Sequence, residues 1–257
     1  MVIINDKSSV NSIIHQDGKN VKKNEKLYQI LFTAPQTVTD NLSKQIDKWL
    51  SGQMRSDEQF DIGMTPEVLK QLGANDLPVV MSQDVMAKIT GLKHSISIKE
   101  IKKLPNSIAD PVMVFSSSTV PNAYVILTEL TDNNDNDIIV AMHLNRMEYK
   151  HKINRISSIY GKENIKNFVL KNINDGNLKY IEKNKSQEWS ECRGLQLPKL
   201  NTILNSDNII LEKEDIVNRY FEQNEKNLSE NKNPRYKIPQ SRIWQSSAEY
   251  QLENEAI

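Results

Sequence analysis

The sequence has one cysteine, few glycines and no long apolar run, and each shortage excludes a class of protein. Cys192 alone can form neither a disulfide within the chain nor a cysteine-based zinc site, so we expect a reducing compartment. The eight glycines spell neither a dinucleotide-binding nor a P-loop motif, so we expect no cofactor. No stretch approaches the roughly 18 apolar residues of a membrane helix, so no membrane partner is expected.

An excess of charge of either sign is also missing. Lysine plus arginine and aspartate plus glutamate number 33 each, so any site for a polyanion must be a local patch. The N-terminus lacks the apolar segment of a secretory signal, which predicts a cytoplasmic protein or one delivered into a target cell without a conventional signal peptide. Residues 132–137, DNNDND, have the composition of a calcium loop but not its glycine or closing glutamate, so no metal is expected.

Composition and patterning divide the chain into three parts. We predict a flexible N-terminus and helical extension at 1–59, an α+β domain at 60–221, and a polar, mostly disordered tail at 222–257. Helix signals fill residues 39–104. The expected N-caps are Thr39, Thr65, Ser82 and Ser97.

The hydrophobic period then changes from helical to strand-like. Three β-rich runs lie at 112–115, 124–130 and 137–144, and we assign 152–160 as the fourth strand. Helices are expected again near 163–176, 186–194 and 212–224, with a further short strand near 178–183. The predicted fold is therefore α+β: N-terminal helices followed by a four-stranded antiparallel β-meander, then C-terminal helices.

The fourth strand lies in HKINRISSIYGK, residues 151–162, whose pattern is ambiguous. Ile153, Ile156 and Ile159 recur every three residues, which is typical of a helix. The position after three strands, together with closely spaced polar residues and a tyrosine, favours a strand. We predict a strand that contains an irregularity.

The same region holds the densest basic concentration of the chain. Residues 146–171 contain seven lysines and arginines against two glutamates, with Tyr149 and Tyr160 among them. Cations of this kind hold nucleic-acid phosphates, and tyrosines stack on bases. The alternative is a solvated face that is balanced by acids from elsewhere.

One histidine, His94, is a candidate acid–base group. His94 lies in a loop between two helices, where a pKa near neutrality suits proton transfer, although a loop histidine also serves as a local hydrogen-bonding residue. His143 lies in the strand 137–144, and we interpret it as an ordinary strand histidine. The hydroxyls of SSIYG, beside the basic run, could contact a phosphate.

Several short blocks between about residues 60 and 217 resemble the C-terminal domain of phage MuF-type proteins. These blocks are TPEVLKQLGANDLPVVMSQDVMAKITGLKHSI, LPNSIADPVMVFSSS, VILTEL, IIVAMHL, INRISSIYGK, LKYIEKNKSQEW and RGLQLP. The resemblance implies a toxin or effector module related to the barnase, EndoU, colicin and RelE group of metal-independent ribonucleases. It also implies a catalytic histidine from the helical part and a hydroxyl or basic residue from the last strand.

The resemblance, taken with the basic region, predicts a phage- or mobile-element-associated toxin or effector that cleaves RNA by acid–base catalysis without a metal. RNA is the expected substrate, and an immunity protein or a host target is a further expected partner. The predicted catalytic residues are His94, Ser158, Tyr160 and Arg155, and the predicted phosphate-binding residues are Lys150, Lys152 and Lys162.

Two alternatives remain open. One is a non-catalytic inhibitor or binding module for a host protein or nucleic acid. The other is an effector similar to ADP-ribosyltransferases, in which the serine-rich strand end at 115–119 and Glu129 would form the site.

Overall fold

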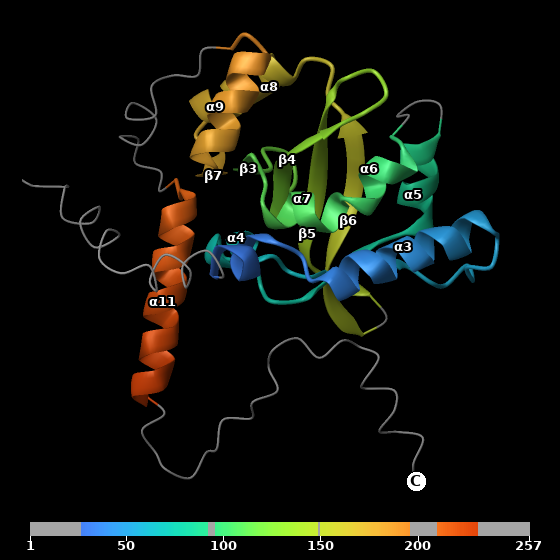
Figure 1. Cartoon of the computed structure of the whole chain (residues 1–257), viewed down its shortest axis with the longest axis horizontal. Coiled ribbons are helices and arrows are strands. Elements are labelled where there is room, and N and C mark those ends of the chain that lie inside the picture. Colours follow the sequence, from blue (N-terminus) through green and yellow to red (C-terminus); the bar gives the residue numbers. More distant parts are fainter. Residues whose placement is uncertain (1–26, 92–95, 149, 196–209, 231–257) are drawn as a thin grey trace, which may run out of the picture. The chain divides into compact units, whose positions relative to one another are not determined.

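The computed structural model describes residues 27–91, 96–148, 150–195 and 210–230, and the chain divides into two units, Met1–Lys213 and Glu214–Ile257. In the described residues, the first unit contains one seven-stranded sheet with the order β1-β2-β6-β5-β4-β3-β7 (Figure 1). The strands are β1 (Phe60–Met64), β2 (Pro78–Met81), β3 (Met113–Ser116), β4 (Ala123–Thr131), β5 (Asp137–Glu148), β6 (His151–Gly161) and β7 (Leu178–Ile181).

The predicted four-stranded antiparallel sheet is wrong in strand number and in strand direction. The four expected strands do pair antiparallel in chain order, as β3, β4, β5 and β6, but they form only the middle of the sheet. Strand β7 extends one side, whereas β2 and β1 extend the other, and β2 runs parallel to β6. Strands β1 and β2 have only five and four residues between helices, too few for a clear alternating pattern.

The first face of the sheet is covered by helices from the N-terminal half. Helix α3 (Gln36–Leu50) packs on β1, α5 (Gln83–Thr90) on β6, and α7 (Leu104–Ala109) on β4. Phe60, Met81, Ile156 and Met142 form one row across β1, β2, β6 and β5, and all four are fully buried. Apolar burial of this kind contributes about 1.5–3 kcal/mol for each large side chain, so this face forms a hydrophobic core.

The helix caps agree only partly with the predictions. Ser82 and Ser97 accept hydrogen bonds from the backbone N–H groups of the third residue on, as predicted, and so begin α5 and α6 (Ile98–Lys102). Thr39 is not a cap, because α3 already begins at Gln36 after Pro35. Thr65 is not a cap either: α4 (Glu67–Gln71) follows Pro66, and the Thr65 hydroxyl instead joins a buried hydrogen-bond network described in the Discussion.

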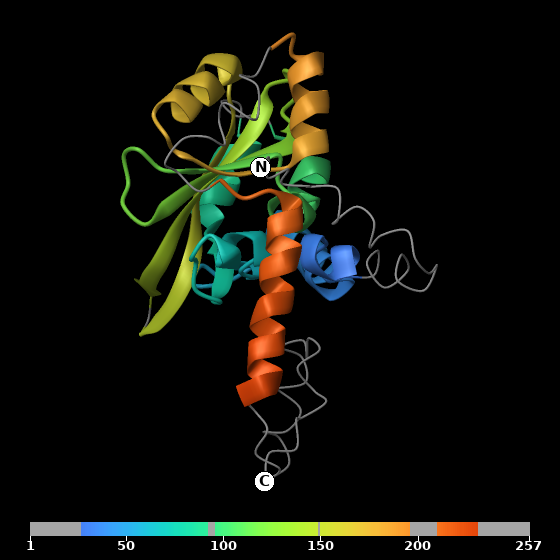
Figure 2. The same ribbon diagram turned by 90° about the vertical axis from the view of Figure 1, so that its left-hand side faces the viewer.

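The second face of the sheet carries α8 (Ile165–Asn174) and α9 (Lys183–Cys192) over only part of its width. Val169 of α8 and Trp189 of α9 pack in one cluster with Phe115, Leu127 and Ile139 of β3, β4 and β5. In Figure 2 the hairpin of β5 and β6 projects past the helices at the lower left. The half-buried polar side chains of β5 and β6 on this second face form the candidate site.

The second unit begins within α11 (Lys213–Glu230). This helix continues nine residues into the range that the sequence assigns to the polar tail. Of the N-terminal range predicted as flexible terminus and helical extension, 1–59, residues 1–26 fall outside the described residues. Among the described helices, none is both long and apolar enough to span a bilayer.

Candidate active site

Strand β6 contains the predicted irregularity, a β-bulge at Ser157. Ile156 pairs with Met142 and Ile159 pairs with Val140, so both isoleucines face the buried first side although three residues separate them. The extra residue, Ser157, donates its hydroxyl hydrogen bond to the Ala141 carbonyl at 3.1 Å. In a regular strand, residues three apart point to opposite faces. The extra residue at the bulge places Ile156 and Ile159 on the same face.

The bulge brings three predicted site residues to the second face beside His143. Arg155 pairs with His143, and Ser158 pairs with Ala141, the next residue of β5 on that face. Tyr160 pairs with Ile139, one step further. Directly paired residues share a face of a sheet, so Arg155, Ser158, Tyr160 and His143 line one strip.

His143 lies at one end of this strip, opposite Arg155, and is half-buried. Burial lowers the pKa of His143 below its ordinary value of 6.5, and the charges of Arg146 and Arg155 lower it further. Its ring makes no hydrogen bond to any residue in the described part of the chain. A neutral imidazole beside two guanidinium groups can accept a proton while the arginines bind an anion.

Arg155 is held in place by an ion pair. Its Nη1 lies 2.6 Å from Oε1 of Glu148, and the other oxygen of Glu148 accepts a hydrogen bond from Gln59 at 2.8 Å. Glu148 is therefore bound on both oxygens, whereas the Arg155 side chain remains 38% exposed. The pair fixes the guanidinium next to His143 and leaves part of it accessible to a ligand.

The predicted phosphate-binding residues Lys150, Lys152 and Lys162 do not lie together on the face that carries Arg155. Lys152 pairs with Met147 and therefore points to the face opposite Arg155. Lys150 lies in the hairpin turn with a φ of 74°. Together with Arg146 and His151 these residues are exposed and form a basic tip on the β5–β6 hairpin.

Lys162 lies at the other end of β6. Its Nζ is 6.0 Å from the centroid of the Tyr160 ring and 5.7 Å from that of Phe168. Burial raises the pKa of Tyr160 above its ordinary value of 10.0, so the phenol stays protonated and can donate a hydrogen bond. Lys162 also lines a cavity of about 340 Å³ at this end of the sheet.

Two other predicted elements lie elsewhere. His94 falls outside the described residues. Glu129, the glutamate of the ADP-ribosyltransferase interpretation, binds Lys185 at 2.8 Å, and the same lysine binds Asp110. In this structure Glu129 therefore contributes to a salt-bridge network between β4, α7 and α9.

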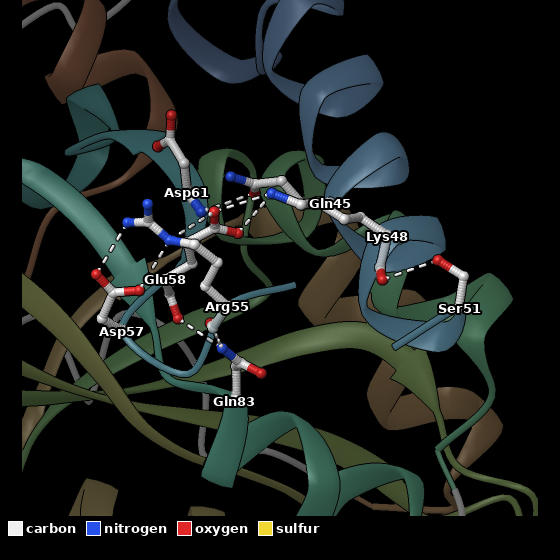
Figure 3. A network of polar contacts seen from close by, with 8 residues as sticks. All are labelled: Gln45, Lys48, Ser51, Arg55, Asp57, Glu58, Asp61 and Gln83. Atoms are coloured by element: carbon white, nitrogen blue, oxygen red, sulfur yellow. Dashed lines mark hydrogen bonds and ion pairs between the residues drawn. The ribbon is translucent and has the colours of Figure 1, made fainter. Parts of the chain in front are cut away.

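Figure 3 shows a network of polar contacts that joins α3, the segment leading into β1, and α5. Lys48 binds Glu58 at 2.8 Å, and Arg55 binds Asp57 at 2.9 Å, so the charges of this network pair with one another. The hydrogen bond from Lys48 lowers the pKa of Glu58 below its ordinary value of 4.5. The side-chain amide of Gln83 donates hydrogen bonds to the backbone carbonyls of Arg55 and Glu58. These contacts indicate a structural role for the network.

Comparison with known proteins identifies the central part of the chain. Residues 85–188 match the family model of the phage MuF-C-terminal domain, which confirms the resemblance predicted from the sequence over those residues. No curated protein and no solved structure matches the chain. The matched residues include β3 to β7 and therefore His143, Arg155, Ser158 and Tyr160.

His143 is the site residue that sequence reasoning missed. Alternation along β5 indicates that it faces away from Met142 and Leu144, but not which residues lie beside it. Its neighbour Arg155 becomes visible only from the register of β5 with β6, which the bulge shifts. One feature of the sequence could have indicated His143 as a site residue. It is a histidine that alternates with buried residues in a strand, and the next strand along the chain is basic.

Proposed function

We propose that the strip on the second face of the sheet binds RNA and cleaves it without a metal. The observation that carries this proposal is the pairing of His143 with Arg155 on a half-buried face, with Ser158 and Tyr160 along the same strand. The basic hairpin tip continues the positive charge beyond the strip. The match to the phage domain agrees with an effector role but does not by itself specify a reaction.

In this proposal His143 is the general base. The ribose 2′-hydroxyl attacks the adjacent phosphorus, its proton passes to His143, and the bond from phosphorus to the 5′-oxygen breaks. The products are a 2′,3′-cyclic phosphate and a 5′-hydroxyl. Arg155 and Arg146 stabilise the negative charge that develops on the phosphate oxygens.

The departing 5′-oxygen requires a proton, and we assign this role to His94, the acid–base residue predicted from the sequence, because an unperturbed imidazole has a pKa near neutrality. Tyr160 is too distant to serve the same phosphate. It pairs with Ile139, four residues from His143, which corresponds to roughly 13 Å along a strand that rises about 3.3 Å per residue. Tyr160 and Ser158 are therefore assigned to neighbouring nucleotides of the RNA, by stacking and hydrogen bonding.

The test compares wild-type protein with His143→Ala, His94→Ala and the control His15→Ala in bacteria and in purified form. Cleavage of RNA in the presence of a chelator, with cyclic phosphate ends, is expected for the wild type and for the control, whose histidine lies in the sequence before the predicted α+β domain. His143→Ala should lower the rate by about 10²–10⁴-fold with little loss of RNA binding. Cleavage by His143→Ala at the wild-type rate would refute the assignment of the base.

The exposed hairpin favours a second candidate, a non-catalytic binding module for a nucleic acid or a host protein. Met147 at its tip is 61% exposed beside Arg146 and Lys150, as is common for residues that contact a partner. RNA binding that depends on Arg155 and on salt, with intact RNA at every pH tested, would support this module and exclude the nuclease.

A further inference from the structure

The acid that binds Arg155 is itself held by a residue from outside β5 and β6. Glu148 reaches Nη1 of Arg155 with one carboxylate oxygen, at 2.6 Å, and accepts a hydrogen bond from Nε2 of Gln59 with the other, at 2.8 Å. Gln59 lies in the segment between α3 and β1, 89 positions before Glu148. It also precedes residue 85, where the match to the phage domain begins. The N-terminal part of the chain therefore supplies a contact to the strip.

The segment that carries Gln59 is fixed on both sides. Glu58, before it, binds Lys48 at 2.8 Å, and the Glu58 carbonyl accepts a hydrogen bond from Gln83 at 2.9 Å (Figure 3). Phe60, after it, is fully buried in the core on the first face. Side chains of adjacent residues in an extended chain alternate between faces, which agrees with the contact of Gln59 on the second face. The network of Figure 3 thus holds the backbone from which Gln59 reaches Glu148.

Glu148 governs how the positive charge of the second face is shared. The pairing of β5 with β6 places six charged or titratable residues on this face, namely His143, Arg146, Glu148, His151, Arg155 and Tyr160. The neighbouring strands β4 and β2 add Ala123 opposite His143 and Val80 opposite Arg155, and neither carries a charge. Glu148 is thus the single acid in this set. Arg146 is exposed and forms no ion pair with any residue in the described ranges.

Arg155 keeps hydrogen-bond donors for a ligand although it is ion-paired. Glu148 takes only Nη1, and the rest of the guanidinium donates to no residue that the structure describes. A guanidinium carries several N–H donors in a fixed plane, so one carboxylate sets its direction and offsets its charge without using all of them. Such an arginine adds little to the attraction of a bound phosphate, but it can meet the charge that grows on the phosphate oxygens during reaction.

We propose that Gln59 and Glu148 are positioning residues of the strip. Gln59 holds Glu148 on Arg155, Glu148 orients Arg155 beside His143 and offsets its charge, and Arg146 is left as the cation that attracts RNA. Neither positioning residue touches the RNA. Their effect on the reaction rests on the proposed function, whereas their effect on the charge around His143 does not.

The experiment compares the wild-type full chain with Glu148→Gln, Gln59→Leu and the control Gln71→Leu, whose amide donates to Glu67 at 2.8 Å on α4, outside the strip. Glu148→Gln removes a negative charge, so the pKa of His143, followed by NMR, should fall further below that of the wild type. Affinity for single-stranded RNA should rise, and the slope of log K against log salt should steepen by about 0.7, as for one added phosphate contact. Both KM and kcat should fall, kcat by roughly tenfold or more, because the arginine is no longer oriented.

Gln59→Leu leaves every charge in place and should act in the opposite direction on binding. Glu148 is then no longer held on Arg155 and can pair with Arg146, so RNA affinity should fall together with kcat. Gln71→Leu loses the same kind of hydrogen bond and should keep wild-type values of both. Gln59→Leu also provides the test if Glu148→Gln does not fold.

The outcomes separate this proposal from the nuclease. An unchanged or raised His143 pKa in Glu148→Gln would overturn the role of Glu148. Equal RNA affinity and kcat in Gln59→Leu and Gln71→Leu would overturn the role of Gln59. The ring titration needs no RNA, so it decides the first point even if the wild type neither binds nor cleaves RNA, a result that would overturn the proposed function alone.

Discussion

Asn154 of β6 allows a sharp test of how the site is supported. Its side chain is fully buried and makes three hydrogen bonds. The amide nitrogen donates to the Thr65 hydroxyl at 2.8 Å and to the Asn75 carbonyl at 3.1 Å, and the amide oxygen accepts from the Asn145 backbone at 2.9 Å. Asn145 lies where the register of β5 shifts between His143 and Arg146, so Asn154 fixes the backbone that carries both residues.

Asn154→Ala should lower the free energy of unfolding by about 3–5 kcal/mol. Two lost hydrogen bonds contribute about 1 kcal/mol each, and the unpaired Asn145 N–H costs about 1–3 kcal/mol more. At roughly 2–4 °C per kcal/mol for a protein of this size, the melting temperature should fall by about 10 °C. Asn154→Asp keeps the acceptor but buries a carboxylate against two oxygens. Its free energy of unfolding should therefore be far below that of the wild type at pH 7, and the difference should become smaller as the pH falls toward 4.

Urea unfolding followed by tryptophan fluorescence measures these changes, with Asn133→Ala in the exposed loop between β4 and β5 as the control. The control should change stability by less than about 0.5 kcal/mol. A similarly small effect of Asn154→Ala would show that the three hydrogen bonds do not support the fold, and would refute the network. A double mutant with Thr65→Val should lose less than the sum of the two single changes, because the two side chains share one hydrogen bond.

Two further predictions concern the ends of the strip. Gly161→Ala should lower the free energy of unfolding by about 1–3 kcal/mol, because the added Cβ would lie 2.0 Å from Oδ2 of Asp132. In the control Gly91→Ala the Cβ would lie 3.2 Å from its nearest atom, so the loss should be smaller. Equal melting temperatures of the two variants would contradict this prediction. Because the folded pKa of His143 is below 6.5, its neutral form contributes stability that is present above pH 6.5 and is lost as the pH falls through the folded pKa. An NMR titration of the ring should show this lowered pKa, and Arg146→Gln should raise it; a pKa at or above 6.5 in the wild type would be inconsistent with a buried ring beside two arginines.

The part of the fold that follows local rules could be predicted from the sequence. Ser82 and Ser97 begin helices because a hydroxyl satisfies a free N–H, and the meander follows from β-rich runs joined by short polar turns. The parallel pairing of β2 with β6 could not be predicted, because Val79 and its partner Asn154 lie 75 positions apart in the sequence. Nothing in the residues near either strand records that contact.

The bulge explains both the correct and the incorrect parts of the site prediction. Isoleucines every three residues resemble a helix, yet Ile156 and Ile159 share a face here because Ser157 is the extra residue between them. The pattern alone could not show which side chains the shift brings together. It therefore grouped Lys152 with Arg155, which point to opposite faces, and separated His143 from Arg155, which are paired.

The position of β6 within the sheet has a consequence for where this domain can be cut. The residues that match the phage domain begin at 85, after β1 and β2, yet β2 is the strand that pairs with β6. A fragment limited to 85–188 would leave the backbone N–H and C=O groups along that side of β6 without partners. Such an edge is a template for pairing with another chain, so the fragment should self-associate, whereas in the full chain β2 covers this side of β6.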